Sequence, residues 1–185
     1  MTVADDMGQA EGPAEYARRC VESLVRRRSI PPAPASEVFA ARAACFVSIK
    51  KGGDLRGCVG TLAPAEAHLA REIARNAASA AFHDPRFHPV REDELPELTY
   101  SVDVLSASDP ATVGELDPRR YGVIVATGFR RGVLLPDLAG VDTVARQLAI
   151  ALQKAGIEPD EEFSIERFTV TRYREGCEPT GDRAS

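Results

Sequence analysis

The sequence predicts an α+β fold with a largely antiparallel sheet and about three main helices. Apolar residues recur with the period of a helix in three segments and alternate as in strands in about six others. Several strands are separated by turns of hairpin length, such as Gly52-Gly53-Asp54, where glycine reaches positive φ without strain. The regular strand–helix alternation of a doubly wound sheet is missing, which argues against a parallel α/β architecture.

Three helices are expected from their apolar spacing and their end signals. The first covers Glu15–Arg28 and ends in three arginines, which suit the negative end of the helix dipole. The second follows Pro64 and covers Ala65–Phe82, with a line of small alanines that indicates close packing. The third begins after a candidate N-cap at Asp142 and stops at Gly156.

Strands are expected where apolar and polar residues alternate, because successive side chains of a strand point to opposite faces. Near Glu166–Arg167 the apolar residues change from odd to even positions, which indicates a bulge or a bend. The expected strands cover 43–50, 55–61, 98–105, 121–126 and 132–135, together with a last segment around 163–170.

Length and charge bound the domain organisation. The chain has 185 residues, which suits one domain, and 44% of them are hydrophobic, which suits a globular protein. We expect a disordered N-terminal tail at 1–13, a folded domain at 14–174 and a flexible C-terminal tail at 175–185. The net charge of −5 belongs to the tails, since the body holds equal numbers of acids and bases. A neutral body argues against a nucleic-acid-binding protein.

Composition also bounds the location and the cofactor classes. No apolar run reaches the ~20 residues of a membrane span, and the acidic N-terminus lacks a signal-peptide pattern. We therefore expect a cytoplasmic protein without membrane contact. The four cysteines form no CxxC pair, so neither a disulfide framework nor a metal site is expected. The sequence contains no phosphate-binding glycine motif and identifies no cofactor.

The densest group of chemistry-bearing residues is the strand segment Leu55-Arg56-Gly57-Cys58-Val59-Gly60-Thr61. Alternation predicts that Arg56, Cys58 and Gly60 share one face. Leu55 and Val59 are then free to face the core. A guanidinium beside a thiol favours the thiolate, so Cys58 is the candidate nucleophile and Arg56 its activating or anion-binding partner.

The two glycines beside Cys58 have two interpretations, because glycine weakens a strand and needs a reason there. In the first, they leave room for a ligand, and Gly57, Gly60 and Thr61 are candidate ligand-binding residues. In the second, Cys58 is a buried small hydrophobe and the glycines let a helix pack closely. Arg56 also has two interpretations of equal weight: it forms an ordinary salt bridge, or it serves the ligand site.

A second group of polar residues lies in the loop His83–Pro89. Asp84 precedes a proline at a helix end, and its carboxylate either pairs with Arg86 or accepts hydrogen bonds from loop N–H groups. Arg86 either takes part in that pair or binds an anionic ligand bidentately. Farther along, Arg130 and Arg131 are neighbours that point oppositely in a strand. At most one of them faces a ligand site, and Arg131 is taken as the candidate.

Four ordered blocks of the sequence resemble the AMMECR domain family, in particular its bacterial branch, AmmeMemoRadiSam system protein A. They are similar to the LRGCxGT signature, to the AFxDPRF and RRGxLLP blocks, and to a fourth, more divided block. In this chain the blocks are Leu55–Thr61, Ala81–Phe87, Arg130–Pro136, and Val141–Val144 with Gln147 and Lys154–Ile157. Phe129 departs from the pattern, since a small residue, often glycine, is expected there.

The resemblance implies two unequal subdomains with the signature cysteine in a cleft between them. It also implies a Memo-type protein and a radical-SAM protein as partners, and it brings no settled reaction. We expect a thiol-dependent enzyme or a binder of a small anionic ligand. Its catalytic residues would be Cys58, Arg56 and Asp84, and its ligand-binding residues Gly57, Gly60, Thr61, Arg86 and Arg131. The alternative is a non-catalytic partner protein whose cleft surface docks those proteins.

Overall fold

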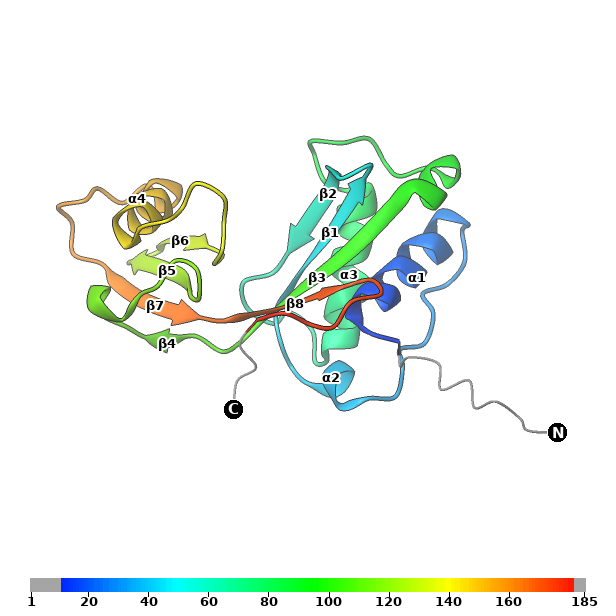
Figure 1. The fold of residues 1–185 in the computed structure, drawn as a ribbon, viewed down its shortest axis with the longest axis horizontal. Coiled ribbons are helices and arrows are strands. Elements are labelled where there is room, and N and C mark those ends of the chain that lie inside the picture. Colours follow the sequence, from blue (N-terminus) through cyan, green and yellow to red (C-terminus); the bar gives the residue numbers. More distant parts are fainter. Residues whose placement is uncertain (1–10, 182–185) are drawn as a thin grey trace.

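Two lobes of unequal size lie side by side in the protein (Figure 1). The computed structural model describes residues 11–181, so most of the N-terminal tail (1–10) and the last part of the C-terminal tail (182–185) lie outside the described residues. Each lobe holds a four-stranded sheet, with strand order β2-β1-β3-β8 in the larger lobe and β4-β7-β5-β6 in the smaller. The paired strands are antiparallel throughout, which confirms the predicted fold class, although there are two sheets.

The sheet of the larger lobe is built on a tight hairpin. Its first two strands are joined by Gly52 and Gly53, whose φ angles of 59° and 94° are left-handed, as a two-residue hairpin turn requires. The third strand has the bounds that alternation predicts. The strands are β1 (Cys45–Lys51), β2 (Asp54–Gly60), β3 (Leu98–Leu105) and β8 (Val170–Arg174).

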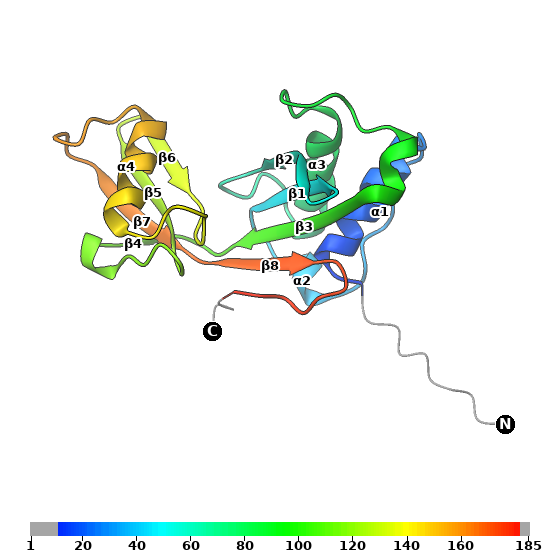
Figure 2. The ribbon, with the colours of Figure 1, turned by 45° about the horizontal axis from the view of Figure 1, so that its top comes forward.

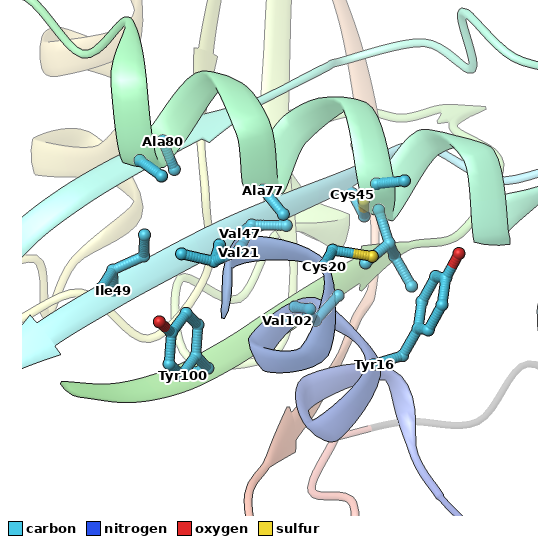
Figure 3. Packing of buried hydrophobic residues seen from close by; sticks show 14 of the residues in the cluster. Tyr16, Cys20, Val21, Cys45, Val47, Ile49, Ala77, Ala80, Tyr100 and Val102 are labelled. Carbon is cyan, nitrogen blue, oxygen red and sulfur yellow. The ribbon is translucent and has the colours of Figure 1, made fainter. Parts of the chain in front are cut away.

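The helices α1 (Pro13–Val25) and α3 (Leu69–Phe82) cover one face of this sheet, with the short helix α2 (Glu37–Ala40) at the edge. Side chains such as Val21, Val47 and Ala77 form the core between them (Figure 3). The second expected helix differs at its start, since α3 begins at Leu69 and not at Ala65. The N–H groups of Ala65 and Glu66 donate to the buried carboxylate of Glu72, which holds residues 61–68 as a loop.

The smaller lobe packs one helix on its sheet, as Figure 2 shows. The helix α4 (Val144–Ala155) is capped by Thr143, whose hydroxyl accepts from the Arg146 N–H, so the cap lies one residue after the expected Asp142. It ends at Gly156, whose φ of 66° is left-handed. The strands are β4 (Asp109–Pro110), β5 (Gly122–Thr127), β6 (Arg130–Leu134) and β7 (Ser164–Phe168).

The chain passes between the lobes at two adjacent points. The bend expected near Glu166–Arg167 lies at Thr169, where β7 of one sheet ends and β8 of the other begins. The Thr169 carbonyl accepts from the Ser106 N–H at 3.0 Å, which ties the two crossing segments together. A small apolar cluster, the junction cluster, joins the lobes there; its buried members are Ala44, Leu105, Ile124, Val133, Phe168 and Val170.

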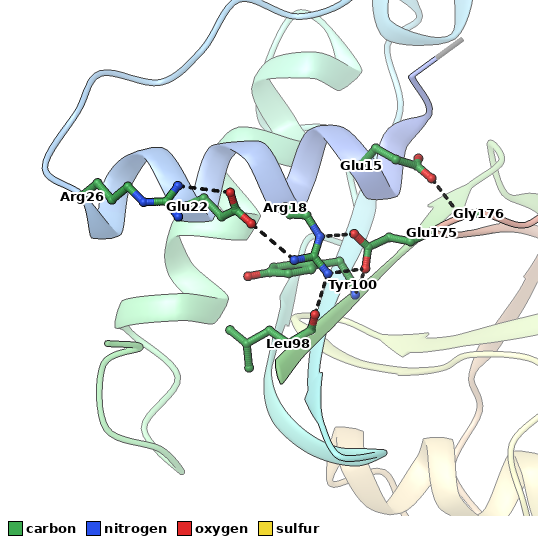
Figure 4. A network of polar contacts seen from close by, with 8 residues as sticks. All are labelled: Glu15, Arg18, Glu22, Arg26, Leu98, Tyr100, Glu175 and Gly176. Atoms are coloured by element: carbon green, nitrogen blue, oxygen red, sulfur yellow. Dashed lines mark hydrogen bonds and ion pairs between the residues drawn. The ribbon is translucent and has the colours of Figure 1, made fainter. Parts of the chain in front are cut away.

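The segment after β8 is attached to the larger lobe, although residues 175–185 are expected to be a flexible tail. The Glu175 carboxylate accepts from the Arg18 guanidinium at 3.0 Å and from the Tyr100 N–H at 2.9 Å (Figure 4). Thr180 exchanges two backbone hydrogen bonds with Arg172. These contacts hold residues 175–181 against α1, β3 and β8.

Within residues 11–181, the helices are too short or too polar to span a lipid bilayer.

Candidate functional site

A β-bulge in β2 changes the direction of the motif side chains. Ile49 pairs with Gly57, but the next residue of β1, Lys50, pairs with Leu55, so Arg56 is the extra residue. The expected alternation of side chains is therefore wrong for Leu55 and Arg56, which precede the motif cysteine. Leu55 is 40% exposed and does not enter the core. The bulge points Arg56 toward a 3-10 helix, Glu92–Glu97, that precedes β3.

Arg56 forms a bidentate ion pair with Glu94. Its Nε donates to Oε1 at 3.0 Å and its Nη2 to Oε2 at 2.9 Å, and the two side chains are only 14% and 11% exposed. Hydrogen bonds from Arg56 lower the pKa of Glu94 from 4.5 to about 2. The ion pair between Arg56 and Glu94 is the ordinary salt bridge that the sequence left open, and both residues belong to the larger lobe. Arg56 therefore joins β2 to the 3-10 helix, and its guanidinium is committed to Glu94.

The backbone of Cys58 is held on both sides by Asp84 and Arg86. The Asp84 carboxylate accepts from the Cys58 N–H at 2.9 Å, and Arg86 Nη2 donates to the Cys58 carbonyl oxygen at 3.4 Å. Arg86 also donates to both Asp84 oxygens, at 3.0 and 2.7 Å. Asp84 is 4% exposed, and the hydrogen bonds from Arg86 keep its pKa well below the usual range. Both interpretations of Asp84, ion pair and loop N–H acceptor, thus apply.

The Cys58 thiol lies on the sheet face away from α1 and α3. Its cross-strand partner is Ser48, whose Oγ is 3.2 Å from the sulfur, and the neighbours of Ser48 in β1 are core residues. Cys20 and Cys45 differ, because they lie in the core of the larger lobe (Figure 3). Burial raises their thiol pKa values to about 11 and about 12. Cys58 is partly exposed and Cys177 is exposed.

The two glycines beside Cys58 lie close to other groups of the protein, as their packing interpretation expects. A Cβ on Gly57 would lie 2.2 Å from the carbonyl oxygen of Ala80, so only glycine lets α3 approach β2 this closely. A Cβ on Gly60 would lie 2.3 Å from the ring of Phe46, which covers the space that the missing side chain leaves. Phe46 itself packs against the junction cluster.

Thr61 positions the loop that follows β2. Its hydroxyl donates to the buried carboxylate of Glu72, and its N–H donates to the Cys45 carbonyl oxygen at 3.0 Å. The hydroxyl and the N–H of Thr61 are therefore both engaged inside the protein.

Arg131 lies away from Cys58, at a pocket between the lobes. This interlobe pocket has a volume of about 290 Å³ and includes residues of both lobes. Arg130, the residue before Arg131, points to the opposite sheet face, where it pairs with Glu161. Cys58 lies outside the lining of this pocket. The lining residues used below are Arg42, Ser108, Ile124, Arg131, Val133 and Phe168.

Comparison with known proteins identifies the family. The AMMECR1 family model matches residues 14–176 of the chain. The chain belongs to the AMMECR1 family.

Relatives of this AMMECR1 chain occur in bacteria and archaea. A Thermotoga maritima protein is 49% identical over 166 residues, which cover 86% of this chain and 95% of that protein. Protein CA_C1420 of Clostridium acetobutylicum is 51% identical over 146 residues, or 79% of this chain, and the chain spans only 31% of that protein. The crystal structure of the uncharacterized protein PH0010 from Pyrococcus horikoshii superposes with a TM-score of 0.79 at 26% identity, covering 90% of this chain and 91% of that one.

Several residues that shape this AMMECR1 site have no signal in the sequence. Glu94 and Phe46 act through contacts with Arg56 and Gly60 that only the folded chain creates. Arg42 reaches the interlobe pocket from the segment before β1, for which the sequence analysis predicts no site residue. For metals, the described part of the chain holds no group of three or more His, Cys, Asp or Glu side chains arranged around a common point.

Proposed function

We propose that this AMMECR1-family protein carries a reactive thiol at Cys58, which acts as a nucleophile or as the contact for a small anionic substrate. The observation that supports it is the setting of the thiol. Its side chain faces the open side of the sheet, while its backbone is fixed by the buried Asp84 and by Arg86. A nucleophile on a rigid element keeps a defined direction, which is what catalysis by positioning requires.

In this proposal the roles differ from those expected from the sequence. Arg86 Nη2 donates to the Cys58 carbonyl oxygen at 3.4 Å, so Arg86 acts on the strand that carries the thiol. Arg56 has no such contact with Cys58, since the bulge directs it toward the 3-10 helix, where it pairs with Glu94. Asp84 is a positioning residue, because it bonds the cysteine's backbone and orients Arg86.

Alkylation by iodoacetamide tests the proposal. The Cys177→Ser protein removes the exposed thiol, so that native labelling reports on Cys58. We expect Arg86→Gln to change the rate of this labelling several-fold, because it releases both Asp84 and the Cys58 carbonyl oxygen. The matched control is Arg91→Gln, whose side chain is 73% exposed and paired with Asp93. Equal rates for Arg86→Gln and its parent would contradict the assigned role of Arg86, and no native labelling at Cys58 would contradict the proposal itself.

The alternative, a non-catalytic partner protein, is favoured by one observation. Phe129, at the tip of the β5–β6 turn, is fully exposed and offers an apolar contact. The partners proposed are a Memo-type protein and a radical-SAM protein, on the resemblance of the motif blocks alone. With both partners purified, docking predicts that Phe129→Ser weakens their retention and that Cys58→Ser leaves it unchanged. If the function depends on the thiol, Cys58→Ser abolishes that function even where both partners are still retained.

The proposed location is the cytoplasm. All four cysteines are free, including the partly exposed Cys58. A reducing compartment keeps such thiols available for chemistry.

A further inference from the structure

The interlobe pocket has an apolar floor. Ile124, Val133 and Phe168 line the pocket, and each is at most 6% exposed. All three belong to the junction cluster, which therefore forms the floor of the pocket. Apolar side chains of this kind favour a ligand with a hydrocarbon body. The volume of about 290 Å³ lies at the lower end of the range for small-molecule pockets, so the ligand is small.

The rim of the pocket carries two arginines whose positive charges are only weakly balanced by carboxylates of the protein. Arg42 donates to the Pro64 carbonyl oxygen at 3.2 Å and forms no ion pair with any residue in 11–181. Arg131 approaches Glu166 at 3.8 Å, which is too long for a hydrogen bond, and its side chain is 47% exposed. The Glu166 carboxylate is itself engaged by the Ser108 hydroxyl. The residues that line the pocket include these two arginines and no carboxylate, which leaves a net positive charge at the rim.

A second pocket, beside the motif strand, gives the contrast. It has a volume of about 570 Å³ and includes Arg56, Arg86 and Arg91. Each of these arginines forms an ion pair with its own carboxylate, at 2.9, 2.7 and 2.9 Å respectively. A ligand anion there would compete with an internal carboxylate for every guanidinium. In the interlobe pocket only Arg131 has a carboxylate partner within the described residues, and that contact is longer, at 3.8 Å.

We propose that the interlobe pocket binds a small organic carboxylate with an apolar body. The guanidiniums of Arg42 and Arg131 hold the carboxylate, since a planar fork of N–H donors matches its two oxygens. The hydrocarbon part rests on the apolar floor. Arg42 belongs to the larger lobe and Arg131 to the smaller, so the ligand bridges the two. The proposal goes beyond the thiol site, because Cys58 takes no part in it.

Calorimetric titration of the full chain tests the ligand class. Hexanoate and benzoate are compared with hexanamide and benzamide, which have nearly the same shape and no charge. We expect each carboxylate to bind at least tenfold more tightly than its amide. Inorganic phosphate, which lacks an apolar body, should bind more weakly than hexanoate. Equal affinity of acid and amide, phosphate binding as tight as hexanoate, or no binding of either acid would overturn the proposal.

Two neighbouring arginines provide the matched variants. Arg131→Gln should weaken hexanoate binding at least tenfold, whereas Arg130→Gln, which removes the same charge on the opposite sheet face, should leave it unchanged. Arg131→Lys keeps the charge and should fall between them. Equal weakening by Arg130→Gln and Arg131→Gln would show a general charge effect and contradict the assignment. Calorimetric titration measures binding in the interlobe pocket, and alkylation measures the reactivity of the Cys58 thiol. Each proposal can therefore be contradicted without the other.

Discussion

Replacing Glu94 by glutamine tests the conclusion that Arg56 stabilises the fold and does not activate the thiol. The pKa of Glu94 falls from 4.5 to about 2 because of the hydrogen bonds from Arg56. A carboxyl group with a lowered folded-state pKa stabilises the protein above its unfolded pKa and loses that effect as the pH falls through the folded value. The stabilisation is then about 3 kcal/mol at pH 7 and about 1 kcal/mol at pH 3.

Urea unfolding followed by circular dichroism at both pH values measures this effect. We expect Glu94→Gln to lower the free energy of unfolding by about 3 kcal/mol at pH 7 and by about 1 kcal/mol at pH 3. The matched control is Glu97→Gln in the same 3-10 helix. Its side chain is 62% exposed and contacts Lys51 at 3.6 Å, so the loss should stay within about 0.5 kcal/mol.

Two results would refute the reasoning. The first is a loss below about 1 kcal/mol for Glu94→Gln at pH 7, the scale of one ordinary hydrogen bond. The second is a loss that does not shrink at pH 3. In addition, Arg56→Gln should leave the native alkylation rate of Cys58 unchanged, and a several-fold slower rate would restore Arg56 as the activating residue.

Two further substitutions test the packing around the motif. Gly57→Ala should cost about 1–3 kcal/mol, because its Cβ would lie 2.2 Å from the Ala80 carbonyl oxygen. Gly114→Ala, with nothing within 4 Å, should change the free energy of unfolding by less than about 1 kcal/mol in the same urea assay. Cys58→Ser should cost less than about 1 kcal/mol, since the side chain is partly exposed. A thermal melt showing a loss above about 2 kcal/mol would favour the packing interpretation of this cysteine.

The local elements of the fold follow from local patterns in the sequence. The β1–β2 hairpin is predicted because Gly52 and Gly53 supply the left-handed turn, and Leu98–Leu105 alternates without interruption. The helix start at Leu69 is not predicted, because it depends on the buried Glu72 holding the preceding loop. The change of apolar phase predicts a bend, but the division into two sheets depends on which strands pair across the chain.

The site is predicted in its residues and less well in their contacts. Cys58 and the Asp84–Arg86 pair follow from residue type and short spacing. The role of Arg56 does not follow, for two physical reasons. A single bulge residue reverses the alternation of a strand, and nothing local marks it. Its partner Glu94 lies 38 residues later, on an element that only tertiary packing brings to β2.

The central claim is that Cys58 is the reactive thiol of the folded body. Alkylation followed by peptide mass analysis, in native buffer and in urea, tests it most directly. In native buffer we predict rapid modification of Cys58 and Cys177, while Cys20 and Cys45 stay unmodified because they are buried and their thiol pKa values are raised. In urea all four should react. Native protection of Cys58 equal to that of the two core cysteines would contradict the account.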